Sequence, residues 1–177
     1  MGLFVALGLS LGFVLLHIPN VEMVTAMVFI SGHLMGIKEG IIVGFLTETL
    51  YSLLNPLGAA APPLLIAQVI SMCFTGYLGG IMGLRKYPIN SLHYFRLGFA
   101  GFLSTAIFAI LTTSSFVILM GLSFRELAGS FIYGLGFYAL HIISNIFIFI
   151  SIVPLLLNIA AKTGWFFYPS TAGETTS

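Results

Sequence analysis

Long apolar runs separated by short polar or helix-breaking segments organise this 177-residue chain. The interruptions carry Pro and Gly, which end helices by removing a backbone donor or freeing the backbone. A helix that crosses a bilayer needs about 20 residues, and shorter helices occur in packed bundles. The pattern therefore predicts an all-α integral membrane protein, a six-transmembrane-helix bundle with helices at Gly2–His17, Val21–Met35, Gly40–Leu54, Pro63–Leu84, Tyr94–Met120 and Glu126–Asn158.

These runs predict a single transmembrane domain over residues 1–168, followed by a polar C-terminal tail over residues 169–177. We interpret the first run as a retained helix, because it lacks the basic segment and the clear cleavage site of a signal peptide. The last two runs are long enough to tilt or to extend beyond the lipid. Pro154 is expected to kink or end the last helix.

Composition agrees with a membrane protein and excludes several other classes. The chain is 59% hydrophobic and 6% charged, whereas soluble domains carry about 25% charged residues. A net charge of +1 argues against nucleic acid as a partner. The single Cys73 excludes an intramolecular disulfide and a cysteine cluster for metal. The chain has no Asp, which removes aspartyl proteases and enzymes built on aspartate pairs with magnesium.

Basic residues predict the orientation. Alternate connections carry five of the six, and the opposite side has only Arg125; the five are Lys38, Arg85, Lys86, Arg96 and Lys162. The positive-inside rule places this larger group in the cytoplasm. We therefore expect both termini in the cytoplasm, and three connections outside: Pro19–Glu22, Asn55–Pro63 and Gly121–Arg125.

Three polar residues of the third run share one helical stripe. Glu48, Tyr51 and Asn55 are spaced by three and four residues, which places them on one side of a helix. An ionisable group at membrane depth is costly and normally faces the bundle interior. Either the stripe forms a polar wall of a ligand cavity, or Glu48 ties helices together through hydrogen bonds. Gln68, at a matching depth in the fourth run, is the preferred partner of Tyr51 and Asn55, with a helix–helix hydrogen bond as the simpler alternative.

A second stripe in the last run contains Tyr138, His141 and Asn145. A His-x-x-x-Asn pair can bind a polar ligand, or it can hold a neighbouring helix. His141 alone is not a metal site, because no other histidine has ligand spacing with it. No phosphate-binding loop, serine-nucleophile elbow or nucleophile–base pair is visible, so the chain is not expected to be an enzyme or to hold a cofactor.

Small residues recur on the first run as Ala6-x-x-x-Ser10 and Gly8-x-x-x-Gly12. Such spacing lets another helix approach closely. The approaching helix belongs either to this chain or to another subunit, and the spacing alone does not choose between them.

The stretch Ile18–Gly83 resembles the substrate-binding S components of energy-coupling factor (ECF) transporters. This stretch is over a third of the chain, and several short motifs within it match in order and spacing: Ile18-Pro19-Asn20-Val21-Glu22, Ser31-Gly32-His33-Leu34-Met35-Gly36, Gly40-Ile-Ile-Val-Gly44, Leu54-Asn55-Pro56-Leu57-Gly58, Pro62-Pro63-Leu64 and Ala67-Gln68. The later half is similar to the family only in its pattern and length of runs.

The resemblance implies a six-helix fold that holds a vitamin or related micronutrient near the outer face of a prokaryotic cell membrane. Asn20 and Glu22 would then form the lid or rim of the pocket; in the simpler interpretation, Asn20 caps the next helix and Glu22 stabilises its N-terminus. The resemblance also implies docking onto a membrane coupling (T) subunit driven by two cytoplasmic ATPases, which alone use ATP.

In the family, an Ala-x-x-x-Ala face of the first helix meets the coupling subunit. Here the nearest match is Ala6-x-x-x-Ser10, a departure from the family pattern, with Gly8 and Gly12 beside it. The family does not identify the substrate, because S components share a fold while their pockets differ. An autonomous secondary carrier or channel for a small polar solute is the alternative hypothesis, and a membrane enzyme ranks last.

Overall fold

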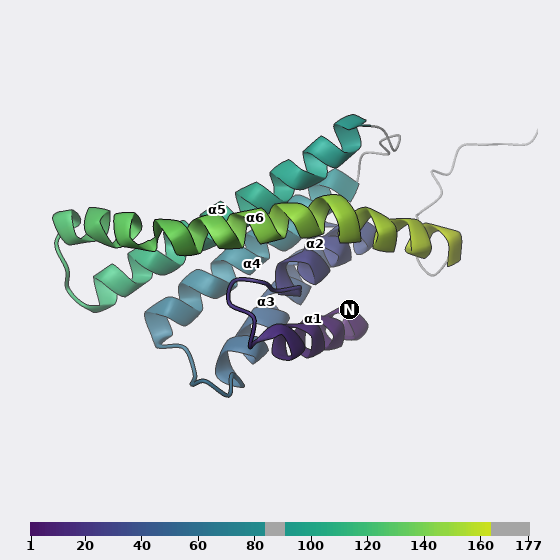
Figure 1. Cartoon of the computed structure of the whole chain (residues 1–177). Coiled ribbons are helices and arrows are strands. Elements are labelled where there is room, and N and C mark those ends of the chain that lie inside the picture. Colours follow the sequence, from purple (N-terminus) through teal and green to yellow (C-terminus); the bar gives the residue numbers. More distant parts are fainter. Residues whose placement is uncertain (84–90, 164–177) are drawn as a thin grey trace, which may run out of the picture.

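The computed structural model describes residues 1–83 and 91–163, in which the chain forms six α-helices and no strand (Figure 1). The prediction of an all-α protein is therefore confirmed for this part of the chain. The helices are α1 (Gly2–Leu15), α2 (Val24–Met35), α3 (Ile37–Leu53), α4 (Pro62–Gly83), α5 (Ser91–Leu119) and α6 (Phe124–Thr163).

Each helix boundary lies within three residues of the predicted one, except at the end of α6. Gly36 ends α2 with a φ of 112°, and Gly121 turns the chain between α5 and α6 with a φ of 64°. Glycine adopts such positive φ values without a steric cost. Pro154 lies inside α6, which continues to Thr163, so the proline does not end the last helix.

Within residues 1–83 and 91–163, three helices are long and apolar enough to cross a membrane: α4, α5 over Leu92–Val117, and α6. At a rise of about 1.5 Å per residue, the 14 residues of α1 and the 12 of α2 are shorter than the roughly 30 Å hydrocarbon core. The structure thus shows an all-helical protein with three candidate membrane-spanning helices. It confirms the six predicted helices and does not establish six spans.

The core is built around α2. Residues 24–32 of this helix are all buried, because α1, α3, α4, α5 and α6 all contact it. A helix that is apolar on every side is stable only when it is surrounded in this way. The Phe29 ring, fully buried, packs against Phe149 of α6 at a centroid distance of 5.0 Å. This contact joins the α6 helix to the centre of the fold.

Glycines allow α2, α3 and α4 to pack with their backbones almost in contact, and we call these three helices the glycine-packed unit. A Cβ added at Gly76 of α4 would overlap the Gly40 carbonyl of α3, and one added at Gly32 of α2 would overlap the Gly76 carbonyl. Because glycine has only a hydrogen atom where other residues have a side chain, these glycines set the distance between the three helices of the unit. Close backbone approach of this kind is typical of helix packing in membranes.

The α5–α6 hairpin is built differently. With 40 residues, α6 is about 60 Å long, and its first part projects with the end of α5 beyond the other helices (Figure 1). We call residues 110–140 the α5–α6 arm. Its large apolar side chains are mostly exposed, among them Ile110, Phe116, Phe124, Ile132, Tyr133 and Phe137. An apolar surface of this extent on a membrane protein faces lipid or another subunit.

Arg85 and Lys86, which contribute to the predicted orientation, lie outside the described residues, as does the predicted tail. Two contacts join helix ends that the predicted orientation assigns to the cytoplasmic side. The N-terminal amine contacts the Met35 sulfur at 3.8 Å, and Gly83 at the end of α4 lies against His33 of α2. Helix ends assigned to one side thus gather at one end of the molecule.

Candidate functional site

A polar cluster lies where the α1–α2 connection meets α6. Glu22 accepts a hydrogen bond from the Thr25 backbone N–H at 2.9 Å and another from the Asn145 side-chain amide at 3.2 Å. His141 Nε2 lies 3.7 Å from the Glu22 carboxylate. Asn145 is fully buried. One carboxylate thus holds the first turn of α2 and joins it to the middle of α6.

Asn20 completes this group, which we call the Glu22 cluster: Asn20, Glu22, His141 and Asn145. Its backbone has a φ of 60°, a left-handed conformation that asparagine tolerates better than most residues. The Ser144 hydroxyl donates to the Asn20 carbonyl at 2.6 Å. This bond fixes the α1–α2 connection onto α6.

Three buried polar atoms of the Glu22 cluster have no hydrogen-bond partner: Asn20 Nδ2, His141 Nε2 and Asn145 Oδ1. Leaving a buried donor or acceptor unsatisfied costs about 1–3 kcal/mol, so such groups are uncommon. Two of them, His141 Nε2 and Asn145 Oδ1, belong to side chains that meet the Glu22 carboxylate, and the Asn20 backbone contacts the same part of α6. The three atoms include both a donor, the Asn20 amide N–H, and an acceptor, the Asn145 amide oxygen.

The electrostatics of Glu22 follow from the same contacts. Burial raises the pKa of Glu22, but the neighbouring His141 imidazole and the hydrogen bonds from Thr25 together lower the pKa by a larger amount. The pKa of this carboxyl therefore lies below its ordinary value. Glu22 is a carboxylate at neutral pH, and its buried charge faces the His141 imidazole.

A second polar group, Glu48, Ser52 and Gln68, joins α3 to α4, and we call it the Glu48 cluster. The Ser52 hydroxyl lies 3.0 Å from the Glu48 carboxyl oxygen Oε1 and 3.0 Å from the Gln68 side-chain amide oxygen Oε1. Glu48 is only 2% exposed. Because a serine hydroxyl has one hydrogen, it donates to only one of these two acceptors at a time.

Tyr51 packs its side chain against α1. Its ring stacks on Phe13 of α1 at a centroid distance of 5.1 Å and lies against Gly12, where an added Cβ would be 2.7 Å from the ring. Tyr51 of the predicted polar stripe therefore joins α3 to α1.

The structure corrects the predicted partners of Gln68. Its hydrogen bond reaches Ser52 and not Tyr51 or Asn55. The Asn55 side chain instead accepts a hydrogen bond from the Leu57 backbone N–H at 2.9 Å, which stabilises the turn after α3. Asn55 therefore has a local structural role in this arrangement.

Tyr138 has a hydrogen-bond partner on α5. Its hydroxyl is 2.6 Å from the Thr113 hydroxyl, so it joins α6 to α5 within the α5–α6 arm. Tyr138 and His141 lie three residues apart on the continuous α6, and His141 meets the edge of Phe108 at a centroid distance of 5.9 Å. Nothing in the sequence indicated either partner on α5.

The small residues of α1 divide between two surfaces. Gly8 and Gly12 are buried, and a Cβ at Gly8 would lie 2.8 Å from the Thr47 side chain of α3. Their spacing therefore serves packing within the chain. Ala6 and Ser10 are exposed, so of the four predicted interface residues only these two remain accessible to another subunit.

Three contributors to the clusters were missed from the sequence: Thr25, Ser52 and Ser144. For each of them, the distance along the sequence from a cluster residue could have indicated the contact. Ser52 lies four residues after Glu48, Thr25 three after Glu22, and Ser144 three after His141. Such offsets place side chains or backbone groups on one helix face. Serine and threonine are common in helices, however, and the spacing does not identify partners on other helices.

No group of three metal-ligating side chains occurs within residues 1–83 and 91–163. Glu22 and His141 form only a pair, and structural zinc sites use four ligands. Hydrogen bonds and charges, and not metal ligation, are therefore what these two clusters offer to a ligand.

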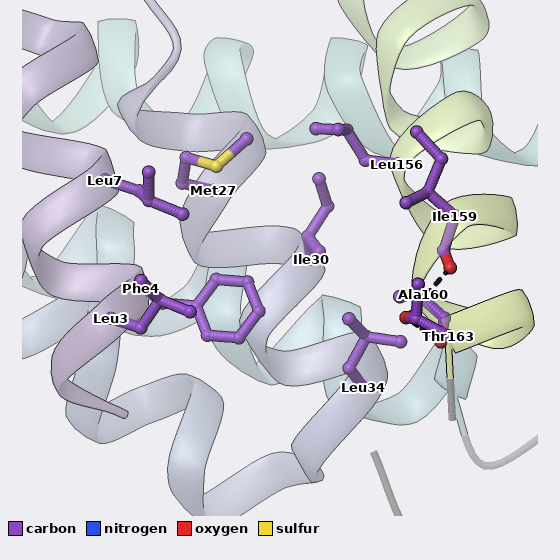
Figure 2. Close-up of a pocket in the computed structure, with 10 residues that line it drawn as sticks. All are labelled: Leu3, Phe4, Leu7, Met27, Ile30, Leu34, Leu156, Ile159, Ala160 and Thr163. Atoms are coloured by element: carbon purple, nitrogen blue, oxygen red, sulfur yellow. Dashed lines mark hydrogen bonds between the residues drawn. The ribbon is translucent and has the colours of Figure 1, made fainter. Parts of the chain in front are cut away.

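An apolar groove of about 340 Å³ lies between α1 and α6 over α2 (Figure 2). Its lining residues are almost all aliphatic or aromatic: Leu3, Phe4, Leu7, Met27, Ile30, Leu34, Leu156, Ile159, Ala160 and Thr163. The Thr163 hydroxyl donates to backbone carbonyls of its own helix, Ile159 at 3.1 Å and Ala160 at 3.2 Å. The groove thus has no group positioned to recognise a polar solute.

Comparison of the sequence with models of protein families, with curated proteins and with solved structures finds no match. What the structure itself defines, over the residues it describes, is an all-helical protein with three candidate membrane-spanning helices and two buried polar clusters, one between α2 and α6 and one between α3 and α4. A fold alone does not specify an activity, so the two clusters carry the information about function.

Proposed function

We propose that this chain is a multi-pass solute-binding subunit of a cell-membrane importer, of the S-component kind, and that the Glu22 cluster holds its solute. The observation that carries the proposal is the set of three unpartnered buried polar atoms around Glu22. Intramembrane polar groups are expensive and commonly mark substrate pathways. A bound solute would satisfy the Asn20, His141 and Asn145 side chains together.

The position of the cluster supports binding near one membrane face. Asn20 and Glu22 belong to the connection before α2, and His141 and Asn145 belong to α6. Among the described residues, two hydrogen bonds hold this connection to α6, one from the Ser144 hydroxyl to the Asn20 carbonyl and one from the Asn145 amide to Glu22. Lifting the connection away from α6 would open the cluster, so residues 16–23 would act as its lid.

The proposal includes partners. Without an ATP site of its own, an importer subunit of this kind delivers its solute through a membrane coupling subunit driven by two cytoplasmic ATPases. The exposed Ala6 and Ser10 face of α1 and the apolar groove next to α1 offer small and apolar surface for such a subunit. Apolar, small-residue faces are favoured at helix contacts in membranes. We assign a vitamin or related micronutrient as the solute.

The proposal is tested by native mass spectrometry of the protein purified from its source membrane in mild detergent. A retained small molecule and copurifying coupling and ATPase subunits are expected. Replacing Asn145 with Ala removes the buried amide that binds Glu22 and should abolish retention of the small molecule. Asn55→Ala is the matched control, because the Asn55 side chain bonds only within its own turn. Retention in Asn145→Ala, or none in the wild type, would contradict the proposal.

One observation favours a second candidate, an autonomous secondary carrier. Glu48 is a buried carboxyl within a helix, and it shares the Ser52 hydroxyl with Gln68. Intramembrane carboxyls serve as proton relays in carriers. Uptake driven by a proton gradient into liposomes that contain this chain alone, and its loss in Glu48→Gln, would favour the carrier over the importer subunit.

A further inference from the structure

Two apolar grooves flank the first half of α5, and we call them the paired grooves. One, of about 540 Å³, lies between α5 and α6, and its α6 wall includes Ile146 and Ile150. The other, of about 250 Å³, lies between α4 and α5, with Met82 on its α4 wall. Phe95 and Phe99 line both grooves, and both rings are exposed. These two rings therefore form a ridge that separates the grooves.

The paired grooves have the length of one lipid leaflet. Their lining residues on α5 run from Tyr94 to Leu103, which is about 14 Å at a rise of about 1.5 Å per residue. The hydrocarbon core of a bilayer is about 30 Å thick, so one leaflet supplies about half of that depth. The grooves begin near the start of α5, which is a candidate membrane-spanning helix. They therefore match the depth that the acyl chains of one leaflet reach.

A basic side chain lies at the same end of α5. Arg96, which is half-buried, lines the groove beside α4, and Tyr94 lines the groove beside α6. Arginine binds phosphate through a planar fork of N–H donors, and its apolar stem can lie along an apolar surface while the guanidinium reaches the headgroups. Tyrosine is enriched at the membrane–water interface. The first two turns of α5 therefore offer groups that suit a lipid headgroup.

The predicted orientation adds a reason for the headgroup to be anionic. It assigns Arg96 to the cytoplasmic side, where the leaflet carries anionic lipids. Basic sites between transmembrane helices on that side are typical of anionic lipid binding. Charge complementarity at Arg96 thus favours an anionic lipid over a zwitterionic one.

We propose that an anionic phospholipid binds along α5, with its phosphate at Arg96 and one acyl chain in each of the paired grooves. A phospholipid carries two acyl chains on one headgroup, and the Phe95–Phe99 ridge divides two grooves that start at the level of Arg96. The site uses none of the residues of the Glu22 cluster. It is therefore independent of the proposed solute.

The test measures which lipid the purified chain retains from nanodiscs that contain equal amounts of phosphatidylglycerol and phosphatidylcholine with identical acyl chains. Native mass spectrometry is expected to show more chain bound to phosphatidylglycerol. Arg96→Gln should lower that excess about fivefold, because it removes one basic group from the headgroup. Arg96→Lys keeps the charge and should keep most of the excess. Arg125→Gln is the matched control, because Arg125 is exposed at the start of α6 and lines neither groove.

A second pair of variants tests the grooves themselves. Ile150→Trp places a larger side chain in the groove beside α6 and should lower the retention of phosphatidylglycerol. Ile143→Trp, two turns earlier on α6 at an exposed position that lines neither groove, should not. Because Ile150→Trp leaves Arg96 in place, this pair tests the site even if Arg96→Gln does not fold.

Three results would overturn the proposal. One is equal retention of the two lipids by the wild type, or an excess that Arg96→Gln leaves unchanged. Another is equal retention of phosphatidylglycerol in Ile150→Trp and Ile143→Trp. The third is a dimer that Ile150→Trp dissociates, because the paired grooves would then be covered by a second copy of the chain.

Discussion

The glycine-packed unit and the α5–α6 arm are two solutions to helix packing in one chain. In the unit, Gly32, Gly40 and Gly76 bring three backbones together so closely that a single added carbon would overlap a carbonyl. In the arm, two long helices meet through side chains, and large rings such as Tyr133, which is 93% exposed, point outward. Backbone contact of this kind fixes helix positions tightly, whereas side-chain contact leaves room for adjustment.

The Glu22 cluster lies at the junction of these two regions. Its lid and the first turn of α2 belong to the unit's side, and His141 and Asn145 follow directly after the arm on α6. The residues of the cluster are therefore held on one side by the tightly packed α2, and on the other side by α6, whose position can adjust. Binding of a solute would therefore be expected to move α6 and the lid, and to leave α2, α3 and α4 in place.

The largest expected effect comes from adding a methyl group to the unit. Gly76→Ala places a Cβ into the Gly40 carbonyl, and overpacking of this kind should destabilise the protein by about 3 kcal/mol. Gly129→Ala in the arm is the matched control, because nothing lies within 4 Å of its added Cβ. It should be neutral or stabilising by up to about 1 kcal/mol, as alanine favours helix. Thermal unfolding in detergent measures both, and equal Tm values would remove the distinction between the two regions.

Breaking the junction itself should have the next largest effect. Glu22→Ala removes the bond to the Thr25 N–H and the bond from Asn145, and should cost about 2 kcal/mol as the loss of a helix cap does. Hydrogen exchange should increase at residues 16–25 and 141–145 and remain slow in α3 and α4. Faster exchange throughout the unit would show that the two regions unfold together.

Lowering the pH should weaken the contact between Glu22 and α6 gradually, and by less than Glu22→Ala does. The pKa of Glu22 is lower in the folded protein than its ordinary value, so its contribution to stability is complete above the unfolded pKa of 4.5. That contribution is lost as the pH falls through the lower pKa that Glu22 has in the folded protein. A Tm series from pH 7 to acid should therefore fall less steeply for Glu22→Gln than for the wild type. Parallel curves would mean that Glu22 does not titrate with folding.

The smallest effect is expected inside the arm. Tyr138→Phe removes one hydroxyl contact with Thr113 and should cost about 1 kcal/mol. Thr113→Val should cost a similar amount, and the double variant little more, because both remove the same contact. Solute retention should be unchanged in all three. Loss of the solute in Tyr138→Phe would instead return Tyr138 to the binding site.

Helix content and helix boundaries followed from the sequence alone. Long apolar runs cannot stay in water, and Pro19, Gly36 and Gly121 interrupt the backbone wherever they stand. Both facts are local, so they hold whatever the tertiary arrangement. The sequence also identified Glu22, Glu48, His141 and Asn145 as unusual, because polar groups in apolar runs need a reason to be there.

Only the tertiary structure decided which of these residues meet. Glu22 and Asn145 are 123 positions apart, and no periodicity within one helix reports on a partner from another. The same limit explains why Gln68 was assigned to Tyr51 and Asn55, and why the spacing of Gly8 and Gly12 did not decide between a helix of this chain and one of another subunit. Spacing determines which side chains share a face of a helix; the packing of whole helices determines what each face contacts.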